Sequence, residues 1–290
     1  KKEKKKKGVS YPSRGAYLKK IYDNLNFELT QSQIKVLREI RGDLKSGQPM
    51  NRLIQGDVGS GKTIVSILTA AIVIAKKYQV ALMAPTEILA EQHFESIKRH
   101  CDNVNITCSL ITSNKTQKEK NIIINELKTG ETQFIIGTHS LIQDKVKFDN
   151  LGLIIIDEQH RFGVEHRKLL IEKGIAPEVL AMTATPIPRT LSITIHGDMD
   201  ISIIDELPKN RLPIKSKIVS IQKLDAIYAH MAKEMNNGGQ CFVVYPLIDE
   251  SEKLDLEAAK SGYEKLKKIF KEFKLGYIHG RMKKTEIDQQ

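Results

Sequence analysis

Residues 56–63 read Gly56-Asp57-Val58-Gly59-Ser60-Gly61-Lys62-Thr63, a complete G-x-x-x-x-G-K-[ST] phosphate-binding loop. An apolar pair, Leu53-Ile54, precedes this loop, and a helix-like run from Ile64 to Ala75 follows it. The motif needs this order of strand, loop and helix, because the glycines let the backbone aim its N–H groups at phosphate oxygens. The positive end of the following helix faces the same phosphates.

The loop predicts a site for ATP with Mg²⁺. All eight residues of the loop are expected to bind the nucleotide, and Lys62 is expected to reach its β- and γ-phosphates. The hydroxyl of Thr63 is expected to ligate Mg²⁺. An ordinary Gly-rich turn is the alternative, but it does not explain the Lys-Thr pair or the flanking segments.

Short apolar runs alternate with amphipathic runs through most of the chain. The expected strands are Arg52–Gln55, Val80–Ala84, Ile106–Ile111, Gln133–Ile136, Leu151–Ile156 and Val179–Met182. The expected helices are Gln31–Ser46, Lys62–Lys77, Glu87–Arg99, Thr116–Lys128 and Val164–Glu172. Strands rich in Ile, Val and Leu that alternate with helices predict an α/β domain whose parallel sheet is covered on both faces.

The length of 290 residues predicts about two domains. Two prolines, Pro208 and Pro213, within the seven residues 207–213 indicate a linker, so we expect domains at 24–207 and 208–290. In the second, strands are expected at 214–219, 240–245 and 276–279, with helices at 223–235 and 255–273. This part is too short to close a normal core, which predicts a truncated domain.

The net charge of +11 is concentrated at the start of the chain. Residues 1–20 carry +8, and the other 270 residues carry only +3. We expect residues 1–23 to form a basic arm or linker; a DNA-binding arm and a solvated tail are equally compatible with the lysine run. Three cysteines without metal-ligand spacing predict a reduced, cytoplasmic protein. A disulfide between Cys101 and Cys108 is not expected, and no apolar run is long enough for a membrane span.

Two carboxylates end the apolar run Leu153-Ile154-Ile155-Ile156. We expect Asp157 to hold Mg²⁺ and Glu158 to act as general base toward the attacking water. Alone, such a pair is usually solvated at a sheet edge, but its position about 95 residues after a phosphate loop favours catalysis. Lys62, Asp157 and Glu158 are therefore the expected catalytic residues.

Two further segments have the chemistry to contact the nucleotide. Thr183-Ala184-Thr185-Pro186 follows an expected strand, and its hydroxyls can hydrogen-bond the carboxylates; the alternative is a plain proline turn. Ahead of the loop, the amide of Gln33 can pair with adenine, and the ring of Phe27 can stack on it. Without a nucleotide, the same segment is simply a helix start with Thr30 as N-cap.

Together these motifs resemble the superfamily 2 helicases and translocases. The loop, Asp157-Glu158-Gln159-His160 and Thr183-Ala184-Thr185 resemble motifs I, II and III; Ala84–Gln92 and Gly137–Leu141 resemble motifs Ia and Ib. The resemblance covers nearly everything from about Phe27 to the end. Within the superfamily it is closer to bacterial helicases that regress stalled replication forks than to the transcription-repair coupling translocase.

The resemblance implies a RecA-like domain followed by an incomplete second one. It implies a monomeric motor that moves double-stranded and branched DNA through its two ATPase lobes. Such a motor would serve recombination and repair in the cytoplasm, at the bacterial nucleoid. Thr86 and Thr138 match DNA-backbone positions, and a hydroxyl there suits phosphate contact without base readout. Coupling to translocation is expected of His160, Thr183, Thr185 and Arg189. The family's arginine finger and junction-binding wedge are not recognised, so we expect nucleotide binding to exceed turnover.

Two alternative functions would use the same phosphate loop. The chain could be a nucleotide-gated DNA-binding module without turnover, in which the lysine arm supplies the affinity. It could also be another phosphate-loop enzyme such as a small kinase, but the sequence has no acceptor-pocket signature, and motifs Ia, Ib and III would have no reason to appear there.

Removal of residues 1–7 tests whether the arm contacts DNA. Each lysine that neutralises a phosphate adds about −0.9 to the slope of log K against log salt for duplex DNA. Residues 1–7 contain six lysines. We therefore expect the truncated chain to bind duplex DNA with a slope that is shallower by several units in a salt titration by fluorescence anisotropy. An unchanged slope would show that the lysines are a solvated tail.

Overall fold

The computed structural model describes residues 8–13, 15–185, 199–208, 214–245, 252–280, 282 and 284–290. The chain divides into two compact units, Lys1–Leu212 and Pro213–Gln290, and each is described by itself. The boundary between them falls inside the proline-containing segment that follows Leu207.

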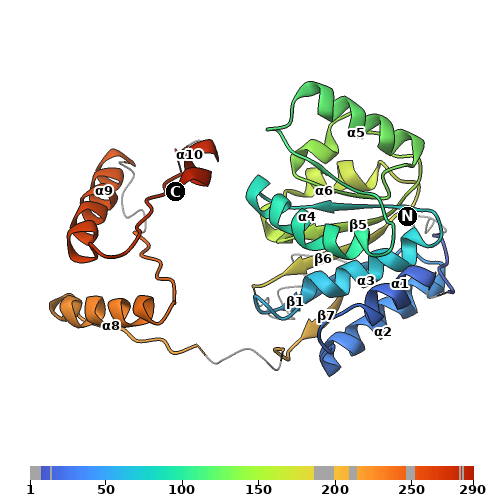
Figure 1. Cartoon of the computed structure of the whole chain (residues 1–290). Helices are drawn as coiled ribbons and strands as arrows, with labels where there is room; N and C mark the ends of the chain where they lie inside the picture. Colours follow the sequence, from blue (N-terminus) through green and yellow to red (C-terminus); the bar gives the residue numbers. More distant parts are fainter. Residues whose placement is uncertain are drawn as a thin grey trace. The chain divides into compact units, whose positions relative to one another are not determined.

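The first unit is built on one parallel sheet of seven strands in the order β3-β4-β2-β5-β6-β1-β7. Figure 1 labels four of these strands, β5, β6, β1 and β7, which follow one another in this order. The strands are β1 (Asn51–Gly56), β2 (Gln79–Met83), β3 (Cys108–Ile111), β4 (Phe134–Gly137), β5 (Leu151–Asp157), β6 (Glu178–Thr183) and β7 (Asp200–Ile204). Every pair of neighbours is parallel, so the carboxyl ends of all seven strands lie at one edge of the sheet. Loops that carry function gather at this edge in α/β folds.

Helices cover both faces of the sheet. They are α1 (Gly15–Asp23), α2 (Gln31–Ser46), α3 (Lys62–Ile74), α4 (Glu87–Asp102), α5 (Gln117–Thr129) and α6 (Val164–Ile171), with 3₁₀ turns η1 (His139–Ile142) and η2 (Gln159–Arg161). Alternate strand residues enter different cores: Leu82 packs with α1 to α4, whereas Ala81 and Met83 pack with α5 and α6. This two-sided burial explains the continuous apolar strands and confirms the predicted α/β architecture.

The predicted elements of the first unit are present, with ends displaced by a few residues. Among the described residues of this unit, the helix α1, the strand β7 and the 3₁₀ turns η1 and η2 were not predicted from the sequence. Residues 8–13 and 15–23, which were expected to belong to a basic arm or linker, pack on the first unit. The amide of Tyr11 donates to the carbonyl of Leu44, and the side chains of Tyr11 and Ile21 are each 2% exposed in the core, so this segment belongs to the first unit.

The second unit contains η3 (Ile221–Lys223), α8 (Leu224–Asn236), α9 (Glu252–Ile269) and α10 (Lys284–Gln289). Tyr228 of α8 meets Phe270, just after α9, edge to face at 5.9 Å between ring centroids. The three expected strands, at 214–219, 240–245 and 276–279, are irregular in the described residues. A strand needs a paired neighbour, and here the apolar side chains of Phe242 and Val244 are more than 80% exposed instead.

The cysteines and the lengths of the helices bear on two expectations from composition. Cys101, Cys108 and Cys241 are all free thiols, as expected. Among the helices of the described residues, none has the length and apolar character of a membrane span.

Glu178, the first residue of β6, carries a buried carboxyl group. Its side chain is 1% exposed, and one oxygen accepts a hydrogen bond from the amide of Met50. The other oxygen has no partner among the residues that the structure describes. Burial raises the pKa of Glu178 from 4.5 to about 7, opposed by the Met50 hydrogen bond. Between about pH 4.5 and 7, Glu178 is therefore mainly protonated in the folded chain and mainly ionised in the unfolded chain.

Replacement of Glu178 by Gln should remove a pH dependence of stability. The pKa of Glu178 is higher in the folded than in the unfolded chain. Its contribution to the free energy of unfolding is therefore fully present below pH 4.5 and is lost as the pH rises to about 7. We expect E178Q to gain up to about 3 kcal/mol over the parent across this window, measured by urea unfolding at several pH values. The exposed Glu165 gives the control variant E165Q, which should follow the parent. A parallel pH profile for E178Q and the parent would contradict the assignment.

Candidate nucleotide site

The phosphate loop joins the buried strand β1 to the buried helix α3. Gly61 is the N-cap of α3 in the left-handed region, with φ of 87°, and no side chain caps this helix. The first N–H groups of a helix have no partner within the helix, so those of α3 remain for a ligand. Together with the helix dipole they form a cradle for an anion.

Gln33 packs directly against this loop. Its Nε2 donates to the carbonyl of Ser60 at 2.7 Å, and its Oε1 accepts from the amide of Thr30 at 2.9 Å. The side chain is 2% exposed, so it bridges the start of α2 to the loop. The expected pairing of Gln33 with adenine would have to share these bonds. Phe27 is 51% exposed, which leaves its ring accessible to a base.

The side chain of Lys62, which is expected to bind the phosphates, folds back onto the backbone of the phosphate loop. Its Nζ donates to the carbonyls of Gly56 at 2.6 Å and Asp57 at 3.0 Å. Burial lowers the pKa of Lys62, while the negative charges of Glu158, Asp157 and Asp57 act in the opposite direction. The ammonium therefore lies within electrostatic range of the acidic pair.

The register of the sheet explains why the acidic pair is near the loop. Asp157 at the end of β5 lies opposite Met182 of β6, and Thr183 lies opposite Gln55 of β1. Gly56, the first loop residue, follows Gln55. Neighbouring strands are about 4.8 Å apart, and β6 lies between β5 and β1. Asp157 is therefore two strand spacings, or about 10 Å, from the start of the loop. That gap suits a triphosphate tail and its metal ion.

Glu158 is held by the strand that lies between the two motifs. Its carboxylate accepts from the hydroxyl of Thr183 at 3.3 Å and from the amide of Ala184 at 3.5 Å. The Thr183 and Thr185 hydroxyls lie 2.9 Å apart, so these three side chains form a connected set. Glu158 itself has a left-handed backbone with φ of 48°, which is unusual for a residue with a side chain and is often found at functional sites.

The residues present suit ATP and Mg²⁺. The hydroxyl of Ser60 is fully buried inside the loop and has no partner among the described residues, which leaves it for a phosphate oxygen. Thr63 and Asp157 offer a hydroxyl and a carboxylate, the hard oxygen donors that Mg²⁺ prefers when phosphates complete its shell. Asp57, Val58 and Gly59 form the exposed tip of the loop.

The expected DNA contacts follow two other strands at the same edge of the sheet. Thr86 follows β2, is exposed, and caps α4 by accepting from the amide of Leu89 at 3.3 Å. Thr138 follows β4 but is only 7% exposed, so its hydroxyl is less accessible than expected. Arg189 lies outside the described residues, and so does the side chain of His160.

Two contacts of this site were not anticipated from the sequence. The ring of His93 on α4 lies 2.7 Å from a carboxylate oxygen of Asp157. The amide of Ser32 donates to the carboxylate of Glu206, and the amide of Glu206 donates to the hydroxyl of Ser32. These partners are 64 and 174 residues apart in sequence, so no local pattern could have identified them.

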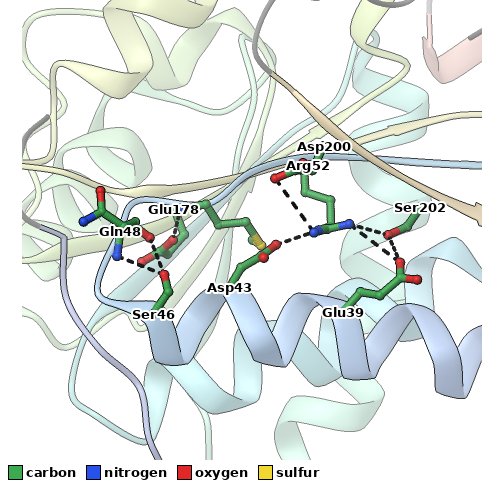
Figure 2. A network of polar contacts seen from close by, with 9 residues as sticks. Glu39, Asp43, Ser46, Gln48, Arg52, Glu178, Asp200 and Ser202 are labelled. Atoms are coloured by element: carbon green, nitrogen blue, oxygen red, sulfur yellow. Dashed lines mark hydrogen bonds and ion pairs between the residues drawn. The ribbon is translucent and has the colours of Figure 1, made fainter. Parts of the chain in front are cut away.

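Arg52 of β1 fixes the far end of α2 (Figure 2). Its guanidinium contacts Asp43 at 2.6 Å and the hydroxyl of Ser202 at 2.9 Å, and that hydroxyl donates to Glu39. Glu39 and Asp43 lie on α2, and Ser202 lies on β7. The helix that carries Gln33 is therefore fixed to the phosphate loop and Glu206 at its start, and to β1 and β7 nearer its end.

The sequence profile of the DEAD/DEAH box helicases matches residues 30–193. This range is more than half of the chain, and it contains the phosphate loop, the acidic pair and Thr183. The chain belongs to the DEAD/DEAH box helicase family. Membership explains why a single sheet edge carries all of these motifs.

Among the proteins of this family, the chain is similar to RecG. It is 48% identical to the ATP-dependent DNA helicase RecG of Aquifex aeolicus (strain VF5) over 93% of this chain and 34% of the relative. It is 50% identical to RecG of Streptococcus pneumoniae serotype 4 (strain ATCC BAA-334 / TIGR4) over 92% and 40%. The chain thus spans about a third to two fifths of the length of these curated relatives.

A solved structure gives the same result for the fold. The structure of RecG bound to a three-way DNA junction superposes with a TM-score of 0.78 at 39% identity, covering 97% of this chain and 37% of that one. The DEAD/DEAH box helicase family therefore accounts for both the sequence motifs and the parallel sheet of the first unit.

Alanine at position 61 should disturb the loop and its buried glutamine. A Cβ at Gly61 would lie 2.2 Å from Nε2 of Gln33, and φ is 87°. We expect G61A to lose about 1–3 kcal/mol of stability and most of its nucleotide affinity, measured by thermal unfolding and calorimetry. Gly42 lies inside α2 with open space around it, so G42A should gain about 0.5–1 kcal/mol. Unchanged stability and affinity in G61A would contradict this description of the loop.

Proposed function

We propose that the chain is the ATPase core of a RecG-like DNA translocase that acts on branched DNA. One observation carries this proposal. The phosphate loop after β1 and the acidic pair at the end of β5 flank the end of β6, and Thr183 of β6 bonds Glu158. Relatives named RecG, and a solved structure of RecG bound to a three-way DNA junction, support the choice of substrate.

When bound, ATP supplies the phosphoryl group and Mg²⁺ neutralises the negative charge of the phosphates. The amides of residues 56–63 and the ammonium of Lys62 bind the phosphate tail. Thr63 and Asp157 hold the metal ion, and Glu158 orients the attacking water and accepts its proton. The Thr183 hydroxyl fixes the Glu158 carboxylate for this role.

The two units are proposed to be the two lobes of the motor. In this proposal Thr86, and Thr138 if its hydroxyl becomes accessible, contact the backbone of duplex DNA without reading bases. Thr183 and Thr185, together with His160 and Arg189, pass the state of the nucleotide to the second lobe. A monomer working on bacterial nucleoid DNA, in recombination and repair, fits this assignment.

Three variants test the proposed site. We expect the parent chain to bind ATP in a Mg²⁺-dependent way in calorimetry. K62A should lose about 1.5–3 kcal/mol of binding free energy for ATP, the value of a hydrogen bond to a charged group. D157A should lose the Mg²⁺ dependence. E158Q should keep the affinity while its turnover falls about 10²–10⁴-fold, because only the general base is removed.

The exposed Lys128 supplies the matched control, since K128A removes the same charge far from the loop in sequence and should bind like the parent. Absence of Mg²⁺-dependent binding by the parent would refute the proposed site. Undiminished turnover in E158Q would refute the role of Glu158 alone.

A further inference from the structure

Helix α4 brings an additional side chain to the acidic pair. His93 lies in the second turn of α4, and its Nε2 is 2.7 Å from Oδ2 of Asp157. Both side chains are only 13% exposed. We propose that His93 is a positioning residue that fixes the Asp157 carboxylate for Mg²⁺. This inference rests on the proposed nucleotide site and adds a residue to it.

The direction of the bond follows from its chemistry. A carboxylate oxygen accepts hydrogen bonds and an imidazole N–H group donates them, so His93 donates the bond from Nε2 to Oδ2 of Asp157. Among the described residues no other hydrogen bond to the Asp157 side chain is formed. Oδ1 is therefore the oxygen that remains for a metal ion.

A single fixed oxygen matters for metal binding. The carboxylate ends a strand, and without a partner it could turn about its side-chain bonds. A hydrogen bond from a second residue fixes the carboxylate in one orientation before the metal ion binds. This lowers the conformational entropy that Asp157 loses when Mg²⁺ binds. Removal of such supporting partners typically weakens metal affinity or activity about 10- to 100-fold.

The position of His93 on α4 also links two parts of the site. Thr86, the expected DNA contact, caps the first turn of this helix. His93 lies about 10 Å further along the axis at 1.5 Å per residue. Between and beyond them, Ala90 and Ile97 are fully buried in the core, so α4 is anchored along this length. The metal ligand and the expected DNA-facing helix end are thus joined through one anchored helix.

Two substitutions at position 93 test the proposal. H93A removes the donor, whereas the amide nitrogen of Gln in H93Q can occupy the place of Nε2. We expect H93A to bind Mg²⁺ in the presence of ATP about 10- to 100-fold more weakly in calorimetry. ATP affinity in EDTA should equal that of the parent. H93Q should recover most of the lost Mg²⁺ affinity.

His100 lies on the same helix and is partly buried, so H100A is the matched control and should bind Mg²⁺ like the parent. Thermal unfolding of all four proteins identifies any loss of fold. Unchanged or tighter Mg²⁺ binding in folded H93A would overturn the proposal, and so would an H93Q variant as weak as H93A. If the parent itself shows no Mg²⁺-dependent binding, the proposed nucleotide site fails instead.

Discussion

The whole site depends on the pairing of β6 with β5 on one side and β1 on the other. Because all strands are parallel, each delivers its following loop to the same edge. The register sets Asp157 opposite Met182 and Gln55 opposite Thr183, so the acidic pair and the phosphate loop face each other across one strand. A shift of β6 by one residue would turn the Thr183 side chain to the other face of the sheet and break its bond to Glu158.

Long-range contacts then hold helix α2 in place beside the phosphate loop. Gln33 bonds the carbonyl of Ser60 in the loop, and Ser32 exchanges hydrogen bonds with Glu206 just after β7. At the other end, Arg52 bonds both α2 and β7. The segment that follows β7 is therefore connected to the same helix that touches the phosphate loop.

The sequence predicted the strand–loop–helix setting of residues 56–63, the place of Asp157 and Glu158 at the end of a strand, and most elements of the first unit, because these depend on local spacing and apolar runs. It did not reveal β7, whose short alternating run Asp200–Ile204 is strand only because it pairs with β1. It did not predict the contact of His93 with Asp157, because that contact depends on how α4 packs. The expected strands of the second unit have no paired neighbour among the described residues, so apolar character alone misled the prediction there.

The most direct measurement is a crystal structure of the chain with Mn²⁺ and a non-hydrolysable ATP analogue, in which anomalous scattering locates the metal. This account predicts one Mn²⁺ ion between the hydroxyl of Thr63 and the carboxylate of Asp157, with the phosphates along residues 56–63. A metal ion bound without Asp157, or phosphates placed away from the loop, would contradict it.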